Sequence, residues 1–165
     1  MRTLLIGGAL GAVVISLTAC GGSGTSATDQ AIQRQADLHA IAQIERTWHK
    51  ATSTHDIHLM MSLWAPNATF TVKPGDTRVG KKEIRRFWLQ APVFQPENHW
   101  VSETPAYKLR ATVNGDKGTL YFECHYVDAK TSKVVAVTAA DERVARINGR
   151  WLITNNVGAS PILSP

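Results

Sequence analysis

The chain is organised around residues 41–72, where the spacing of apolar positions changes from helical to alternating. Apolar residues first recur every three or four positions, a break follows at residues 54–56, and the same spacing then returns as far as Trp64. This spacing places apolar side chains on one face, so it predicts two helices. Asp56 can cap the second helix by accepting an unpaired amide hydrogen. The alternating run at residues 68–72 predicts a strand.

A third helix and a series of strands follow this region. Residues 81–90 carry apolar side chains on one side and basic ones on the other, which predicts an amphipathic helix. After Pro96 the pattern alternates, and Asn-Gly pairs at 114–115 and 148–149 predict tight hairpins. The expected strands cover residues 98–104, 106–113, 119–127, 134–147 and 150–157. Helices followed by antiparallel strands indicate an α+β domain with one curved sheet.

Residues 1–19 are typical of an export signal and are not expected to belong to the fold. Their apolar run is shorter than the about 20 residues that a membrane helix needs. The four residues ending at Cys20 (L-T-A-C) resemble the lipobox of bacterial lipoproteins, and the resemblance implies that Cys20 is lipidated and becomes the new N-terminus. A plain secretory signal is the alternative. Residues 20–28, rich in glycine and serine, should form a flexible tether to a domain at 29–165.

Lipidation of Cys20 would anchor the protein to a bacterial membrane lipid in the cell envelope, on the exported side. Two or more acyl chains hold a protein stably at a membrane, whereas one binds only marginally. Cys124 would then have no disulfide partner, because the sequence contains two cysteines. Without lipidation, a bridge between Cys20 and Cys124 stays open, although a cysteine in a flexible terminus is a poor partner.

Composition and charge narrow the function classes. A chain of 165 residues with 44% hydrophobic and 19% charged residues fits one globular domain. The net charge of +5 is diffuse, and pairs such as Lys81-Lys82 fit the solvated side of a helix, so no nucleic-acid partner is expected. We expect no cofactor and no metal, since His55 and His58 lie at a helix start without a third ligand at useful spacing.

The order of the predicted elements resembles the nuclear transport factor 2-like superfamily, and its SnoaL-like and ketosteroid-isomerase-like branches are the most similar. The resemblance covers about residues 41–157 and rests on the helix that opens at Asp56, the A-T-F-T-V strand, the G-K-K-E-I-R-R-F-W helix and the final N-G-R-W-L-I. It implies a cone-shaped roll, in which three N-terminal helices pack in a curved, mainly antiparallel sheet. It also implies a largely apolar pocket at the wide end, the usual kind of ligand site in a small domain.

Aromatic residues from every element expected to face the cavity supply the candidate ligand pocket. Most of them should belong to the core, and a minority that line a cavity could bind a flat apolar molecule by stacking. The candidate pocket residues are Trp48, Trp64, Phe70, Trp88, Trp100, Phe122, Tyr126 and Asn156.

Asp141 is the candidate catalytic acid. Strand alternation places it in an apolar row with Val137 and Ala139, where desolvation would raise its proton affinity. An ion pair with Arg143 or Arg146 at the rim of the sheet is the structural alternative.

The resemblance to ketosteroid isomerases leaves the chemistry open. It implies that Asp141 matches the protonated aspartate of those enzymes, whereas Trp48 stands where they have a tyrosine and their base falls near residues 72–73. Because two of the three roles are unfilled, whether the protein is an enzyme is uncertain. Glu123 and His125, two residues apart on one strand face, are a weaker acid/base pair because that face should point outward.

Three functions therefore remain open. We favour a lipid-anchored envelope protein whose cone binds a small hydrophobic ligand. The second is an acid/base enzyme of the cyclase, isomerase or dehydratase kind that uses Asp141 with a histidine. The third is an envelope assembly module that acts through the exposed sheet face, where charge placed at Tyr121 or Ile153 would break a complex. The same face could also join two copies of the chain in a homodimer.

Overall fold

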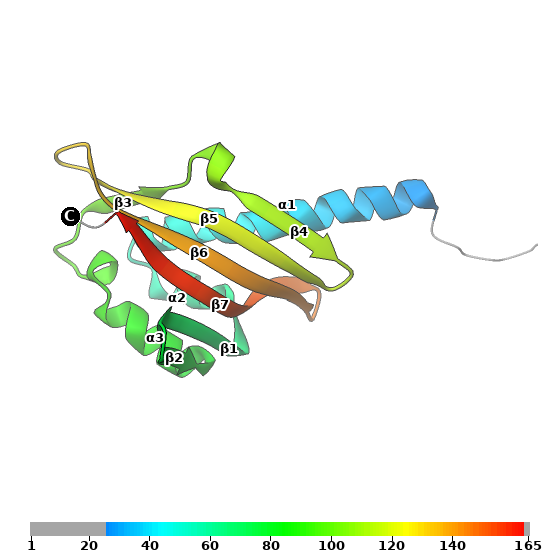
Figure 1. The fold of residues 1–165 in the computed structure, drawn as a ribbon, viewed down its shortest axis with the longest axis horizontal. Helices are drawn as coiled ribbons and strands as arrows, with labels where there is room; N and C mark the ends of the chain where they lie inside the picture. Colours follow the sequence, from blue (N-terminus) through cyan, green and yellow to red (C-terminus); the bar gives the residue numbers. More distant parts are fainter. Residues whose placement is uncertain (1–25, 164–165) are drawn as a thin grey trace, which may run out of the picture.

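The computed structural model describes residues 26–163, so the predicted signal segment and Cys20 lie outside the described residues. The described part has an α+β fold in which helices pack against one face of a curved sheet (Figure 1). Its helices are α1 (Ala27–Ser53), α2 (Ile57–Ser62) and α3 (Gly80–Gln90), with short 3-10 helices η1 (Pro92–Phe94) and η2 (Ala106–Lys108). Its strands are β1 (Trp64–Lys73), β2 (Asp76–Val79), β3 (Trp100–Glu103), β4 (Arg110–Asn114), β5 (Lys117–Asp128), β6 (Lys133–Ile147) and β7 (Arg150–Leu163).

The sheet is mainly antiparallel, as predicted. Its strand order is β2-β1-β7-β6-β5-β3, and β4 pairs with β5 beside β3. Only the β1–β7 pair among the described strands runs parallel. The long hairpins β5–β6 and β6–β7 form the curved centre, and α1 crosses behind them (Figure 1). None of the described helices has both the length and the apolar character needed to cross a membrane.

Helix α1 begins at Ala27, two residues before the predicted start of the domain. Ser26 and Asp29 form a capping box, in which each side chain accepts a hydrogen from the other residue's backbone. Residues 27–36 are exposed, and Figure 1 shows this end of the helix projecting beyond the sheet. Asp37 is the first buried residue, and its carboxylate lies 2.6 Å from Arg146 of β6. This ion pair attaches the projecting helix to the sheet.

The break after α1 follows the prediction, but β1 begins earlier than expected. Asp56 accepts a 2.9 Å hydrogen bond from the Leu59 amide, which confirms the predicted cap. Helix α2 stops at Ser62 and does not reach Trp64, because Trp64 pairs in parallel with Ile153 of β7. The prediction of a helix through Trp64 is therefore wrong, and tertiary pairing decides the conformation there.

Two further segments differ from the sequence prediction. Strand β2 was not predicted, and it forms a hairpin with β1 around Gly75, whose φ of 83° suits a turn. The predicted strand 106–113 divides into η2 and β4.

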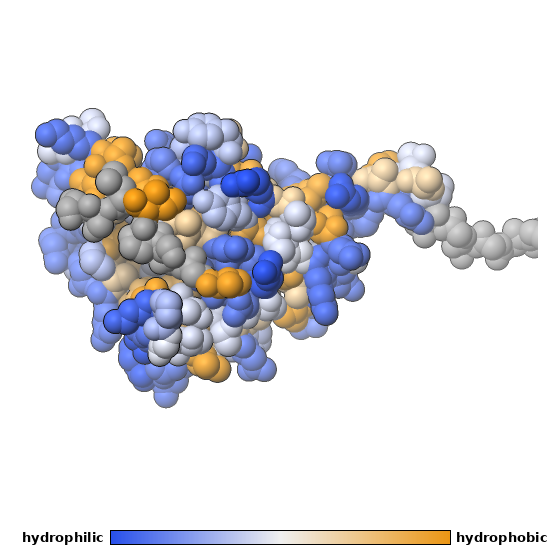
Figure 2. Space-filling model, viewed as in Figure 1, coloured by the Kyte–Doolittle hydropathy of each residue, from blue (hydrophilic) through white to orange (hydrophobic). Residues whose placement is uncertain are grey.

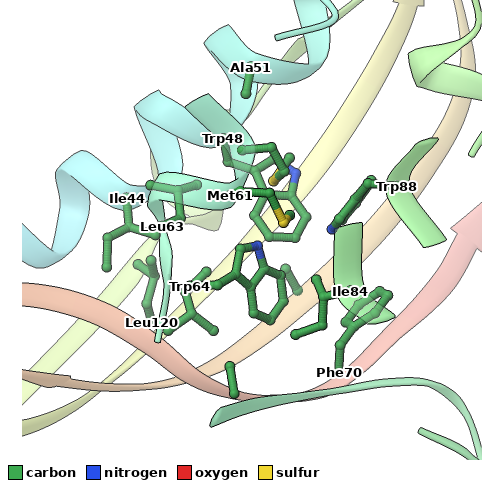
Figure 3. Packing of buried hydrophobic residues seen from close by; sticks show 14 of the residues in the cluster. Ile44, Trp48, Ala51, Met61, Leu63, Trp64, Phe70, Ile84, Trp88 and Leu120 are labelled. Atoms are coloured by element: carbon green, nitrogen blue, oxygen red, sulfur yellow. The ribbon is translucent and has the colours of Figure 1, made fainter. Parts of the chain in front are cut away.

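The core lies between the helices and the concave face of the sheet (Figure 3). Trp48 of α1 contacts Trp64 of β1 and Trp88 of α3, with ring centroids 6.0 and 5.0 Å apart. Phe70 adds a stacked contact with Trp88 at 5.8 Å. The inner face of β5, opposite the one that carries Glu123 and His125, is buried, and Leu120 and Phe122 on it each have 0% exposure. Tryptophans thus fill the middle of the cone.

Candidate functional site

A cavity of about 240 Å³ remains between the helices α1 and α3 and the inner face of the sheet. Its aromatic lining residues are Trp48, Phe70, Phe87, Trp88, Trp100 and Tyr126. Small residues of β6 complete the wall, among them Ala136, Thr138 and Ala140. These three face Tyr126, Cys124 and Phe122 of β5 across the strand pair. The space exists because aromatic rings from α1, α3 and β5 meet small side chains on β6.

The cavity lining carries few polar groups. Tyr126 and Thr138 contribute hydroxyls, and burial raises the pKa of Tyr126 well above its usual range. The Nε1 atoms of Trp48 and Trp88 are buried without a hydrogen-bond partner among the described residues. The described lining residues include no histidine and no carboxylate. The arrangement therefore suits a neutral, mainly apolar molecule better than acid/base chemistry.

The structure corrects the predicted face of Asp141. Asp141 pairs with Tyr121 of β5 on the outer face of the sheet, and it is only half-buried. Its neighbour Glu142 occupies the inner face instead, opposite Leu120, with 0% exposure. Val137 lies on the same outer row as Asp141 and is nevertheless apolar and buried, beside Leu163 of β7. Both rows of β6 therefore carry apolar residues, and alternation alone did not show which row faces the core.

Glu142 is a buried acid held by one hydrogen bond. Its Oε1 accepts a 2.8 Å bond from Nδ2 of Asn156, and its Oε2 has no partner among the described residues. Burial raises the pKa of Glu142 to about 8, while the bond from Asn156 opposes that change. The carboxyl is therefore mainly protonated at neutral pH. Neither Glu142 nor Asn156 lines the cavity, since both lie in the core beyond Ala140.

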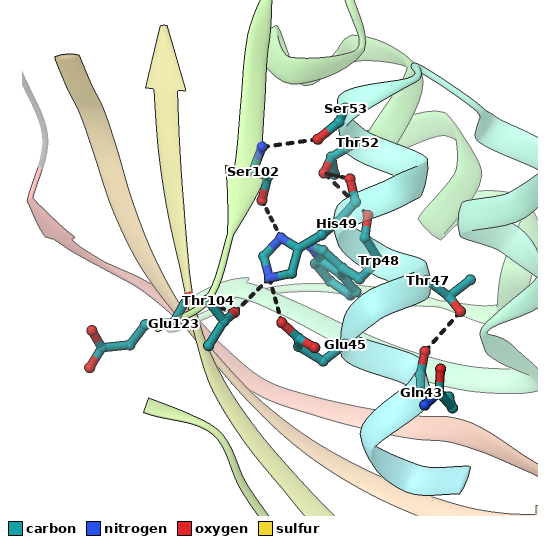
Figure 4. A network of polar contacts seen from close by, with 10 residues as sticks. All are labelled: Gln43, Glu45, Thr47, Trp48, His49, Thr52, Ser53, Ser102, Thr104 and Glu123. Atoms are coloured by element: carbon teal, nitrogen blue, oxygen red, sulfur yellow. Dashed lines mark hydrogen bonds and ion pairs between the residues drawn. The ribbon is translucent and has the colours of Figure 1, made fainter. Parts of the chain in front are cut away.

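A second polar cluster, the His49 network (His49, Glu45, Ser102 and Thr104), joins α1 to β3 (Figure 4). The Ser102 hydroxyl forms a hydrogen bond with His49 Nδ1. The other ring nitrogen, Nε2, lies 2.6 Å from Thr104 Oγ1 and 3.1 Å from the Glu45 carboxylate. Thr104 donates its own hydrogen to the Glu123 carbonyl, so it accepts from His49. When His49 is neutral, its single ring hydrogen therefore lies on Nε2. Its Nδ1 atom then accepts a hydrogen bond from the Ser102 hydroxyl.

The His49 network opens on a groove of about 450 Å³. Burial disfavours the charge on Glu45, but hydrogen bonding and attraction from His49 outweigh it and hold the pKa of Glu45 below its ordinary value. An ionised carboxylate beside a histidine is an arrangement that can move a proton. Phe122 separates this groove from the cavity, because its ring contacts both Trp48 at 5.5 Å and His49 at 5.8 Å.

Comparison with known proteins identifies the family. A model of the SnoaL-like domain matches residues 45–152. The chain belongs to the SnoaL-like domain family. Solved structures of the nuclear transport factor 2-like group share its fold, as the element order predicted. No match is found among curated proteins.

Three solved structures illustrate the likeness of this SnoaL-like domain to other proteins. A nuclear transport factor 2-like protein with a cystatin-like fold from Novosphingobium aromaticivorans is 15% identical, with a TM-score of 0.69 over 84% of this chain and 91% of its own. A protein described as a dehydratase from Streptomyces avermitilis is 17% identical, with a TM-score of 0.61 over 79% and 99%. A type 2 hexachlorocyclohexane dehydrochlorinase is 16% identical, with a TM-score of 0.63 over 81% and 90%. At these identities the likeness shows the fold alone.

The predicted pocket residues of the SnoaL-like domain separate into two groups. The residues that line the cavity are Trp48, Phe70, Trp88, Trp100 and Tyr126. Trp64, Phe122 and Asn156 are buried in the core and do not line it. Sequence reasoning missed Ala136 and Ala140, because a small residue on a strand carries no signal that space lies beside it. It also missed the His49 network.

The outer face of the sheet carries the predicted Glu123–His125 pair. His125 Nε2 lies 3.3 Å from Glu123, which also accepts bonds from Lys108 at 2.9 Å and Tyr121 at 3.1 Å. Ile153 does not belong to this face, because it is fully buried on the inner side. On the side shown in Figure 2, apolar side chains form separate small groups among polar ones. Residues 26–163 contain no group of three or more His, Cys, Asp or Glu that could hold a metal ion.

Proposed function

We propose that this SnoaL-like domain binds a small, mainly apolar molecule in the cavity between α1, α3 and the sheet. The cavity itself carries this proposal, because about 240 Å³ stays open although the tryptophans fill the middle of the cone. A cavity of about 150 Å³ is large enough for benzene, so this one suits a substituted benzene or a bicyclic molecule. The rings of Trp88 and Tyr126 would contribute stacking and buried area.

Binding can be tested by closing the cavity from β6. Ala136 lines the cavity, so Ala136→Phe should fill the space and abolish binding of α-methylstyrene, measured by isothermal titration calorimetry. Val134→Phe adds a ring on the same strand at a residue with 48% exposure, and it should leave binding unchanged. Melting temperatures of the three proteins would show that they fold. Equal binding by wild type and Ala136→Phe would contradict the proposal.

We also propose that Cys20 anchors the domain to the exported side of a bacterial membrane. The L-T-A-C sequence supports this, and α1 starts at Ala27, seven residues further along the chain. In bacteria fed a radioactive fatty acid, the protein should carry label and partition into detergent. Cys20→Ala should remove the label and change the partition, and an unlabelled wild type would refute the anchor.

A second candidate function is acid/base catalysis at the His49 groove. It is supported by the pairing of His49 with Glu45, and by neighbours described as a dehydratase and a dehydrochlorinase. Such eliminations need a base, which His49 could be. Exchange of acidic C–H protons of a ketone in D₂O, followed by NMR, should stop in His49→Gln. It should continue in His125→Gln, whose histidine lies on the outer face, and equal rates in both variants would exclude this function.

A further inference from the structure

The outer face of α3 combines basic and apolar side chains that are exposed to solvent. Lys82, Arg85 and Arg86 are exposed, and so is Leu89, with 44% of its surface accessible. These four residues are three or four positions apart, so they are neighbours on one face of the helix. Ile84 lies on the opposite face and is fully buried in the core. Packing therefore explains the inner face of α3 but not the exposed leucine among its cations.

The positive charge of this outer face is largely uncompensated. Helix α3 contains four basic residues and one acidic residue. The acid, Glu83, pairs with Arg86 at 2.6 Å. Lys82 and Arg85 take part in no ion pair within residues 26–163. A face with this charge attracts an anionic partner.

The outer face of α3 ends beside the edge of the cavity. Phe87 and Trp88 of α3 line the cavity, and so do Ala91 and Pro92 directly after the helix. Among the described lining residues, Pro92 alone is exposed, so the cavity meets the surface at this point. A partner that covers the outer face of α3 therefore also reaches the edge of the cavity.

An anionic membrane surface fits this combination of side chains. Helices that lie on membranes carry Lys and Arg beside exposed apolar residues, because the cations meet lipid phosphates while the apolar side chains enter the acyl boundary. An acidic protein would account for the cations of α3 but leave Leu89 unexplained. The membrane anchor proposed at Cys20 would also keep the domain close to such a surface.

We propose, building on that anchor, that the outer face of α3 docks on an anionic lipid surface. Lys82 and Arg85 meet the lipid phosphates, and Leu89 enters the boundary between headgroups and acyl chains. This orientation brings the edge of the cavity at Pro92 to the membrane, which is the phase where apolar ligands collect.

Sedimentation with lipid vesicles measures the docking. A chain of residues 21–165 keeps every described helix and strand but lacks Cys20, so the anchor cannot hold it to the vesicles. This chain should sediment with vesicles that contain phosphatidylglycerol and much less with vesicles of phosphatidylcholine alone. High salt should release it, because salt screens the attraction between exposed charges.

Two double variants separate the α3 face from total charge. Lys82→Gln/Arg85→Gln should lower the partition coefficient about thirtyfold, since each cation near an anionic surface contributes about fivefold. Lys117→Gln/Arg150→Gln is the matched control. It removes the same charge from two exposed residues in the hairpins at the other end of the molecule (Figure 1). The control should change the coefficient by less than about threefold, because those charges lie farther from the surface than a Debye length.

A second pair of variants tests the apolar contact. Leu89→Gln should weaken binding to anionic vesicles several-fold, because the leucine no longer enters the acyl boundary. Val101→Gln is the control, since Val101 has the same 44% exposure and lies on β3. It should leave binding unchanged.

The outcomes separate docking from the functions proposed above. If the two double variants bind equally, total charge determines binding and the α3 surface is refuted. If wild type binds no anionic vesicles, docking is also refuted, and an acidic protein is then the better partner for α3. Fatty-acid labelling of Cys20 judges the anchor independently. Titration with α-methylstyrene should give one dissociation constant for wild type and Lys82→Gln/Arg85→Gln, because neither residue lines the cavity.

Discussion

The buried carboxyl of Glu142 should make the protein less stable as the pH rises. Its pKa lies near 8 in the folded chain because burial disfavours the charge, whereas the unfolded chain has the ordinary value of 4.5. The unfolded chain therefore ionises first. The stability that goes with the protonated carboxyl is complete below about pH 4.5 and is lost as the pH rises toward 8.

The size of the effect follows from proton linkage. Between these two pKa values the free energy of unfolding falls by about 1.4 kcal/mol per pH unit. From pH 5 to pH 7 the loss is about 2 to 3 kcal/mol, because the unfolded form is only partly ionised at pH 5. Glu142→Gln keeps an acceptor for Asn156 and cannot ionise, so its free energy of unfolding should gain about 2 to 3 kcal/mol relative to wild type over this interval.

Urea unfolding followed by tryptophan fluorescence at pH 5, 6 and 7 measures this difference. Glu123→Gln is the control, because the hydrogen bond from Lys108 holds the pKa of Glu123 below its ordinary value despite burial. An acid whose pKa is lowered by folding contributes stability above its unfolded pKa, and this stability is lost only as the pH falls below that value. The difference in free energy of unfolding between Glu123→Gln and wild type should therefore stay constant from pH 5 to 7. If Glu142→Gln and wild type also differ by a constant amount, Glu142 is not the buried acid described above.

Three further predictions concern the ion pair of Asp37, the space beside Gly118 and the burial of Cys124. Arg146→Met should lower the free energy of unfolding by about 2 kcal/mol in urea, because it leaves the buried Asp37 carboxylate without its cation, and unchanged stability would contradict this. Gly118→Ala should lower stability by about 2 kcal/mol or more, since the new methyl would overlap the Thr112 carbonyl, and a normal melting temperature would refute the overlap. Cys124 should resist alkylation at pH 8 in the folded protein, measured by peptide mass spectrometry, because burial raises the pKa of its thiol to about 12. Rapid labelling would argue against its burial.

Local signals in the sequence predicted much of the fold. The periodicity placed α3, β5 and β6 within about two residues of their observed bounds, whereas β7 runs to Leu163, well beyond the predicted end at residue 157. Asp56 caps α2 as its side chain indicated. The prediction failed where contacts distant in the sequence decide the conformation. Trp64 fits the helical spacing but lies in β1, because it pairs with Ile153, almost ninety residues further along the chain.

The candidate site was predicted only in part. Large aromatic residues such as Trp88 could be assigned to the inside of the cone, because size and periodicity both indicate burial. Which of them border empty space depends on small residues such as Ala140, and that cannot be read from spacing. Asp141 was assigned to the inner face, which Glu142 occupies, because both faces of β6 carry apolar residues and alternation could not distinguish them. His49 finds partners more than fifty residues away, so no local pattern indicated its network.

The most direct test of the ligand-binding cavity uses the indole N–H signals of the five tryptophans in a ¹⁵N-labelled sample. Addition of acetophenone should shift the signals of Trp48, Trp88 and Trp100, which line the cavity. The signal of Trp151 should stay in place, because its N–H bonds to Asp37 at the far side of the core. If all five signals remain unchanged at saturating ligand, or if Trp151 moves as much as Trp88, the cavity is not the binding site.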